Sequence, residues 1–189
     1  MTVLIAREEG FRPLPVDGFP VPTLWRGEQV LLAPAHPEWV DLDYAAVIAS
    51  RSKLKHIFGP QDDWPPEDLT PEMDASDLSW HAREFKRRRS FAYHLLSHDR
   101  QRCLGCLYLY PSASQEHDAE AYLWTHISVA ETQAALIETE VINWVNEEWP
   151  AKAVAWPGRF IPFSQWEEAD IPNYYASTRM NEDSFAFGI

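Results

Sequence analysis

The sequence contains little cysteine, no long apolar segment and few cationic side chains. Cys103 and Cys106 are the only cysteines among 189 residues, so we expect a reduced, cytoplasmic protein that needs no disulfide. No stretch of 18 apolar residues occurs, which predicts no membrane-spanning helix. The first ten residues carry two glutamates and an arginine instead of an apolar core, so we predict no signal peptide.

Acidic side chains strongly outnumber basic ones. There are 29 Asp and Glu against 16 Lys and Arg, and the formal net charge is −13. Nucleic acids and anionic membranes bind basic surfaces, so we predict neither as a partner. A cationic or amine-bearing ligand suits this charge better. The sequence also lacks G-x-S-x-G, a Walker loop and H-E-x-x-H, which excludes several large enzyme classes.

Apolar residues make up 46% of the chain and aromatic residues 13%, which is enough for one packed core. We predict a single domain over residues 1–189. Its N-terminal arm, about 1–23, is rich in proline and extended, and its C-terminal arm, about 160–189, is irregular.

Short aromatic runs bounded by polar turns dominate the middle of the chain. They predict three adjacent antiparallel strands, and the spacing of apolar residues then changes to that of a helix. The predicted strands are 24–32, 90–97, 102–110, 120–127 and 151–156, and the predicted helices are 37–52, 70–89 and 130–149. We therefore predict an α/β (α+β) fold with a mixed, mainly antiparallel central sheet flanked by helices.

The central stretch, 91–128, reads FAYHLLSHDRQRCLGCLYLYPSASQEHDAEAYLWTHIS and has Gly105 inside a strand. Together with the element order over 29–156, it resembles the GNAT superfamily of acyl-CoA-dependent N-acetyltransferases. The resemblance implies that acetyl-CoA lies in a cleft between two splayed strands, here 122–128 and 151–156. It also implies transfer of an acetyl group to an amine of a small molecule or protein.

The resemblance further implies which residues contact the cofactor, namely Trp124, Ile127, Ser128 and Thr132. The loop of the family's form Q/R-x-x-G-x-G/A is replaced here by 125–133, which contains neither glycine nor arginine. Ser128 and Glu131 form S-x-x-E, which predicts a capping box that satisfies the helix N–H groups. The glutamate would also place a carboxylate where the pyrophosphate lies. The arginines that could replace the lost phosphate contacts are Arg100, Arg102 and Arg159.

One face of the predicted strand 120–127 carries four polar or aromatic side chains, namely Glu120, Tyr122, Trp124 and His126. If this face lines a cleft, Glu120 or His126 is the general base, and Tyr122 and Trp124 shape the acceptor pocket. Tyr122 is our third catalytic candidate. The alternative is a sheet face covered by a helix. By analogy with the tyrosine that many family members use, Tyr174 or Tyr175 is either a general acid or a packing residue.

Cys103 and Cys106 have the C-x-x-C spacing of a redox pair or half a zinc site. On a strand, however, residues three apart point to opposite faces, and no second C-x-x-C occurs. His94 and His98 are four apart, but His98 falls in a predicted turn. We therefore predict core cysteines, isolated histidines and no metal.

A second hypothesis is a catalytically silent domain of the same fold. It would bind a ligand or a protein partner, including a second copy of itself as a homodimer, through the acidic surface and the aromatic C-terminal arm. The loop without glycine motivates this alternative.

Overall fold

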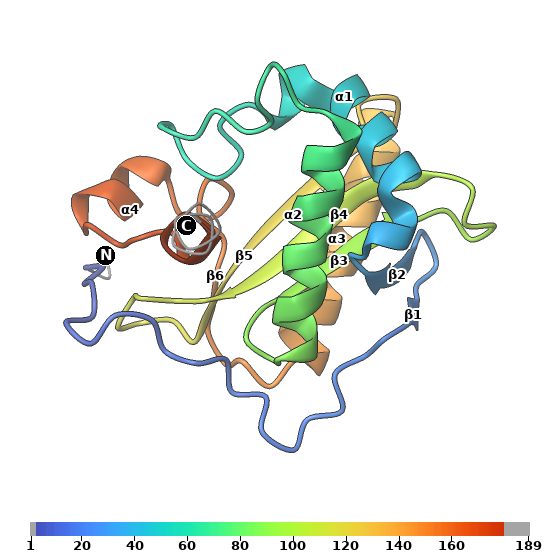
Figure 1. The fold of residues 1–189 in the computed structure, drawn as a ribbon. Coiled ribbons are helices and arrows are strands. Elements are labelled where there is room, and N and C mark those ends of the chain that lie inside the picture. The colour runs from blue at the N-terminus through green and yellow to red at the C-terminus, as the bar shows by residue number, and fades with distance from the viewer. Residues whose placement is uncertain (1–2, 180–189) are drawn as a thin grey trace, which may run out of the picture.

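The computed structural model describes residues 3–179, and its centre is one six-stranded sheet (Figure 1). The strands follow sequence order across the sheet. All neighbours are antiparallel except the last pair, which is parallel. The strands are β1 (Trp25–Arg26), β2 (Leu31–Pro34), β3 (Phe91–Leu96), β4 (Cys103–Pro111), β5 (Ala119–Thr125) and β6 (Val154–Ala155). This arrangement confirms the predicted mixed, mainly antiparallel sheet.

Helices cover both faces of the sheet, as Figure 1 shows. On one face lie α1 (Val40–Leu54), preceded by the short 3-10 helix η1 (Pro37–Trp39), and α2 (Pro71–Lys86). On the other face lies α3 (Glu131–Glu148). Successive side chains of β5 point to opposite faces of the sheet, so they contribute to two cores. Leu123 packs towards α3, and Tyr122 packs towards α1 and α2.

Most predicted helices and strands are confirmed, but the single strand predicted over 24–32 is wrong. Residues 24–32 form two short strands, because the chain turns back where the Gly27 N–H donates to the Val30 carbonyl at 2.9 Å. The C-terminal arm contains α4 (Phe163–Glu168) and a helical segment over 174–179. Within the described range no helix has the length and apolar content needed to cross a membrane.

A β-bulge near the start of β4 changes the side on which its residues point. Leu95 pairs with Gly105 and Leu96 with Cys103, so Leu104 is an extra residue without a partner on β3. Cys103 and Cys106 consequently both face α1 and α2, while Leu104 faces α3. The prediction that the two cysteines point to opposite faces is wrong. Both are buried, which confirms that they are core thiols.

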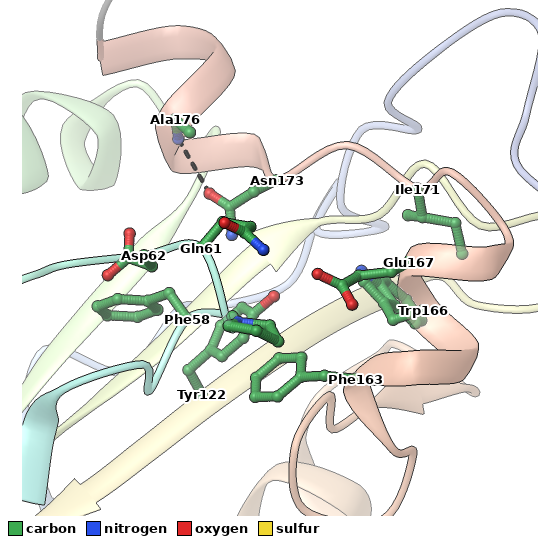
Figure 2. Close-up of a pocket in the computed structure, with 12 residues that line it drawn as sticks. Phe58, Gln61, Asp62, Tyr122, Phe163, Trp166, Glu167, Ile171, Asn173 and Ala176 are labelled. Atoms are coloured by element: carbon green, nitrogen blue, oxygen red, sulfur yellow. Dashed lines mark hydrogen bonds between the residues drawn. The ribbon is translucent and has the colours of Figure 1, made fainter.

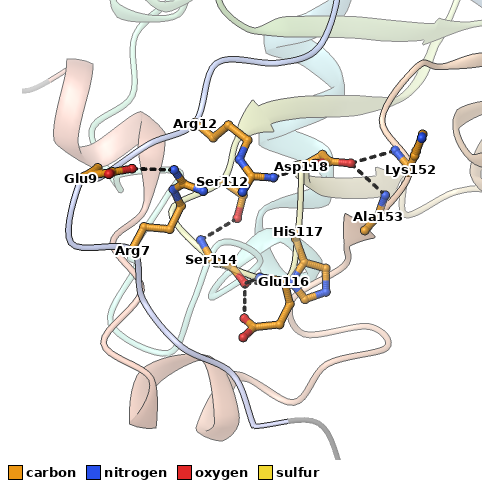
Figure 3. A network of polar contacts seen from close by, with 10 residues as sticks. All are labelled: Arg7, Glu9, Arg12, Ser112, Ser114, Glu116, His117, Asp118, Lys152 and Ala153. Atoms are coloured by element: carbon orange, nitrogen blue, oxygen red, sulfur yellow. Dashed lines mark hydrogen bonds and ion pairs between the residues drawn. The ribbon is translucent and has the colours of Figure 1, made fainter.

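A polar network ties the N-terminal arm to the sheet (Figure 3). Asp118 lies at its centre and accepts a hydrogen bond from Arg12 Nη1 at 2.8 Å. Its other carboxylate oxygen accepts from the backbone N–H groups of Lys152 at 3.0 Å and Ala153 at 3.3 Å. One side chain thus holds both the arm and the segment that leads into β6, and the turn after β6 forms one wall of the site described below.

We expect Asp118→Ala to lower the free energy of unfolding by about 2–3 kcal/mol. The substitution leaves three donors without their charged acceptor, and a hydrogen bond to a charged group contributes roughly 1.5–3 kcal/mol. Urea unfolding followed by circular dichroism measures the change. Asp17→Ala, at an exposed position on the same arm, is the control. An equal effect of both substitutions would contradict the role of the network.

Candidate functional site

A cleft opens where β6 leaves β5. The parallel pairing stops after Glu120 and Ala155, and the chain then turns over residues 157–161 instead of following β5. The edge of β5 beyond that point lines a cavity of about 500 Å³. Its walls come from β5, the turn after β6, the end of α1 and α4: Lys53, Lys55, His56, Ile57, Ala121, Tyr122, Leu123, Pro157, Gly158, Arg159 and Phe163.

The cleft is cationic in a strongly acidic protein. Lys53, Lys55 and Arg159 line it, and its lining residues include no Asp or Glu. Arg159 Nη2 donates to the Leu123 carbonyl at 3.2 Å, and Nη1 donates to Glu138 at 2.8 Å. The first bond holds the guanidinium against the open edge of β5. Of Arg100, Arg102 and Arg159, it is therefore Arg159 that lines the cleft.

The N-terminus of α3 is not capped by the predicted box. Its N-cap is Ala130, which makes no side-chain cap hydrogen bond. The Ser128 hydroxyl instead lies 2.8 Å from His126 Nδ1 and accepts from Arg102 Nη2 at 3.1 Å. The capping-box prediction is therefore wrong, because neighbouring side chains compete for the serine. The first-turn N–H groups keep their capacity to bind an anion.

A second cavity, of about 310 Å³, is also lined by Tyr122 (Figure 2). Aromatic rings form much of its wall, and two carboxylates, Asp62 and Glu167, belong to its lining. The remaining lining residues are Phe58, Gly59, Pro60, Gln61, Tyr122, Phe163, Trp166, Ile171, Asn173 and Ala176. Tyr122 and Phe163 line both cavities. The two cavities therefore share a wall.

Glu120 lies two residues before Tyr122 on the same face of β5 and is fully buried. Burial raises the pKa of its carboxyl to about 8, and the nearby Tyr174 backbone amide and Tyr122 hydroxyl offset part of the shift. Burial also raises the pKa of the Tyr122 hydroxyl well above its usual range. A carboxyl that titrates near neutral pH next to a hydroxyl that stays protonated is suited to proton transfer.

The Glu120 carboxyl makes the stability of the protein depend on pH. Its folded-state pKa, about 8, exceeds the ordinary value of 4.5, so the folded protein retains a proton that the unfolded chain releases. This contribution is complete below about pH 4.5 and is lost as pH rises through 8. We expect Glu120→Gln, which cannot ionise, to gain on the order of 3–5 kcal/mol relative to wild type between pH 5 and pH 9. Chemical denaturation at the two pH values measures this; a constant difference would contradict the assignment.

The order and direction of the strands identify the type of fold. Five antiparallel strands run in sequence order, α3 crosses over, and β6 joins in parallel before it diverges from β5. This is the splayed pair that the resemblance in sequence implies. The fold is GNAT-like.

Comparisons with known proteins find solved structures that are distant from this chain in sequence. No family model matches the chain, and no curated protein matches it. A ribosomal-protein-S5-alanine acetyltransferase from Vibrio fischeri is similar at 10% identity and a TM-score of 0.48, over 66% of this chain and 68% of that one. A ribosomal L7/L12 alpha-N-protein acetyltransferase in complex with coenzyme A has 13% identity and a TM-score of 0.49, over 67% of each chain. A GCN5-related N-acetyltransferase from Brucella melitensis has 14% identity and a TM-score of 0.48, over 85% and 70%.

The GNAT-like fold brings together only part of the predicted catalytic set. Tyr122 lines both cavities, and Glu120 is buried next to it on the same face of β5. His126 lies beyond the other end of β5, about 20 Å of extended chain from Glu120. Its Nδ1 accepts from the Ser128 N–H at 3.0 Å, and burial, Arg102 and Lys53 lower its pKa. The structure therefore supplies one candidate base beside the pocket.

The four predicted cofactor residues also fall into different environments. Trp124 is buried under the helices, and its indole N–H donates to the Tyr108 hydroxyl at 3.2 Å, which is a packing role. Ile127, Ser128 and Thr132 are exposed around the start of α3. Their contact with a cofactor stays a prediction.

Tyr174 and Tyr175 both use their hydroxyl groups in side-chain hydrogen bonds. Tyr174 donates to Glu84 at 2.8 Å, and Tyr175 donates to Asp77. These bonds favour the packing role over the general-acid role that was left open for them.

The sequence interpretation missed the residues that give the two cavities their charge. Lys53 and Lys55 follow the predicted helix 37–52, and the sequence interpretation gave neither of them, nor Asp62 or Glu167, a role in a site. The basic residues in the last turn of α1, Arg51 and Lys53, were an available signal, but cations at a helix C-terminus are also explained by the helix dipole.

Proposed function

We propose that the protein is an N-acyltransferase that moves an acetyl group from acetyl-CoA to the amine of a cationic substrate. The observation that supports this proposal most strongly is the wall that the two cavities share. A cationic cleft and an acidic aromatic pocket are separated by Tyr122 and Phe163, and a carboxyl that titrates near neutrality lies beside that wall.

The cationic cleft suits the donor. Acetyl-CoA carries several phosphate charges, and Lys53, Lys55 and Arg159 offer donors for them. The unpaired edge of β5 offers backbone groups to the amide-rich arm of the cofactor, once Arg159 turns from the Leu123 carbonyl to a phosphate. The N-terminus of α3, where Ala130 makes no side-chain cap, would add backbone N–H groups for a phosphate.

The second pocket suits the acceptor amine. An ammonium group is attracted both to carboxylates and to the faces of aromatic rings. Asp62 and Glu167 supply the charge, while Phe58, Tyr122 and Trp166 supply rings. The volume of about 310 Å³ is that of a small molecule or a peptide terminus.

Tyr122 and Glu120 would move the protons. The ammonium passes one proton to the Tyr122 oxygen while the tyrosine passes its own to ionised Glu120. The neutral amine then attacks the thioester carbonyl carbon, and the carbon–sulfur bond breaks. The second proton of the amine goes through Tyr122 to the leaving thiolate, which yields an amide and free coenzyme A.

Turnover of acetyl-CoA against a panel of amines tests this proposal. We expect polyamines, arylalkylamines and peptide N-termini to be acetylated faster than amines that carry a carboxylate, and mass spectrometry identifies the amide. Tyr122→Phe, which removes only the hydroxyl, should lower kcat by about 10–100-fold. A protein that binds acetyl-CoA but shows no preference for cationic amines would contradict the assignment of the acceptor pocket.

A further inference from the structure

A cluster of metal-ligating side chains lies under α1 and α2, among residues that do not line the two cavities. It consists of Asp43 from α1, His94 from β3 and Cys106 from β4, which are 4%, 0% and 3% exposed. His94 Nε2 lies 2.9 Å from Asp43 Oδ1, and Cys106 Sγ lies 3.5 Å from the same oxygen. All three ligand atoms lie within 4.8 Å of one another.

Cys103 lies next to the cluster. The β-bulge turns its side chain to the same face as Cys106, and its thiol donates to the Gly105 carbonyl at 3.4 Å. The bulge therefore places both thiols of the C-x-x-C pair on the face of the sheet under α1 and α2.

Asp74, from α2, is a further buried acidic group. It is 4% exposed, and its Oδ2 has no hydrogen-bond partner among residues 3–179. Two carboxyl groups, two thiols and one imidazole are therefore buried between the sheet and the helices α1 and α2.

We propose that His94 Nε2, Asp43 Oδ1 and the Cys106 thiolate bind a structural zinc ion, and that the Cys103 thiolate turns from the Gly105 carbonyl to become the fourth ligand. Zinc takes four N, S and O ligands in a tetrahedron, with bonds of roughly 2.0–2.3 Å that place the ligand atoms about 3.5 Å apart. The separations of 2.9 and 3.5 Å fit that geometry after small side-chain shifts. Paired thiolates favour zinc over magnesium or calcium.

The metal would link α1 to the sheet. Asp43 lies in the first turn of α1, and the last turn of the same helix carries Lys53 into the cationic cleft. A zinc ion that fixes the start of α1 on β3 and β4 would hold the helix in the orientation that the cleft needs. This role does not depend on the reaction proposed above.

Metal analysis and cobalt substitution test the proposal without an activity assay. Protein purified under reducing conditions is analysed by mass spectrometry for bound metal, then unfolded with chelator and refolded with Co²⁺. We expect one metal ion per chain and the intense near-ultraviolet absorption of a thiolate bound to cobalt. Zinc should displace the cobalt and raise the melting temperature.

Cys106→Ser is the informative variant, because the hydroxyl replaces the thiol with little change in volume. We expect its affinity for zinc, measured by competition with a chelating dye, to fall by about 100-fold or more. His36→Gln, at an exposed histidine, should bind as wild type does. A wild-type protein that gives no thiolate–cobalt absorption, or a Cys106→Ser variant that binds zinc as tightly as wild type, would overturn the proposal.

Discussion

Glu120→Gln should lower kcat for acetyl transfer by about 100–1000-fold while the affinity for acetyl-CoA changes little. The amide cannot accept the proton that the amine must lose, and general base catalysis contributes roughly 10²–10⁴-fold. Glu120 is buried beside Tyr122 and does not line the cationic cleft, so donor binding should survive. Steady-state kinetics combined with calorimetric titration of acetyl-CoA separate the two effects.

Glu120→Gln should also change how kcat/KM depends on pH. With a pKa of about 8, Glu120 is mostly protonated at pH 7, so kcat/KM of the wild type should rise with pH and level off above 8. The residual activity of Glu120→Gln should lack this rise. Glu72→Gln, at an exposed position on α2, should keep both the rate and the profile. A full-rate Glu120→Gln enzyme would remove Glu120 from the mechanism.

Gly105→Ala should be the most destabilising single-methyl substitution in the sheet, with a loss of about 3–5 kcal/mol. Gly105 has φ of +150°, and an added Cβ would collide with the Trp124 carbonyl oxygen and lie 3.1 Å from the Thr125 Cα. The neighbours are backbone atoms of β5, which cannot rotate away as a side chain can. Left-handed strain of roughly 1–2 kcal/mol adds to overpacking of roughly 1–3 kcal/mol.

Gly59→Ala is a matched control for this substitution. Gly59 has φ of +146°, but nothing lies within 4 Å of the position of an added Cβ. The two variants therefore share the conformational strain and differ in the collision. Denaturant unfolding should show Gly105→Ala losing at least about 2 kcal/mol more than Gly59→Ala. Equal losses of unfolding free energy in the two variants would show that an added Cβ at Gly105 does not collide with the backbone of β5.

The strands could be predicted because their signal is local. The runs that became β3, β4 and β5 alternate or are continuously apolar and end at polar turns. The helix predicted over 70–89 is α2, and the Thr70 hydroxyl at its start accepts from the Met73 N–H at 3.2 Å. The bulge could not be predicted in the same way. It depends on how closely Gly105 approaches Trp124, a residue 19 positions further along the chain.

The site was predicted less completely, for a related reason. Glu120 and Tyr122 belong to one strand, and their shared face follows from period two. Arg159 and Lys53 reach the cleft from segments more than 100 residues apart, and no local pattern relates them. The S-x-x-E pattern predicted a capping box that does not form, because the Ser128 hydroxyl is hydrogen-bonded to His126 and Arg102. The order of these residues in the sequence does not reveal those bonds.

Calorimetric titration of acetyl-CoA into the wild-type protein and two charge variants tests the central claim most directly. We predict micromolar binding, weakened by about 10-fold in Arg159→Met, which removes one charge-assisted contact. Lys152→Met, at an exposed cation that does not line the cleft, should bind as the wild type does. Heat equal to that of dilution at millimolar acetyl-CoA would contradict the account and favour a catalytically silent domain that binds a different partner.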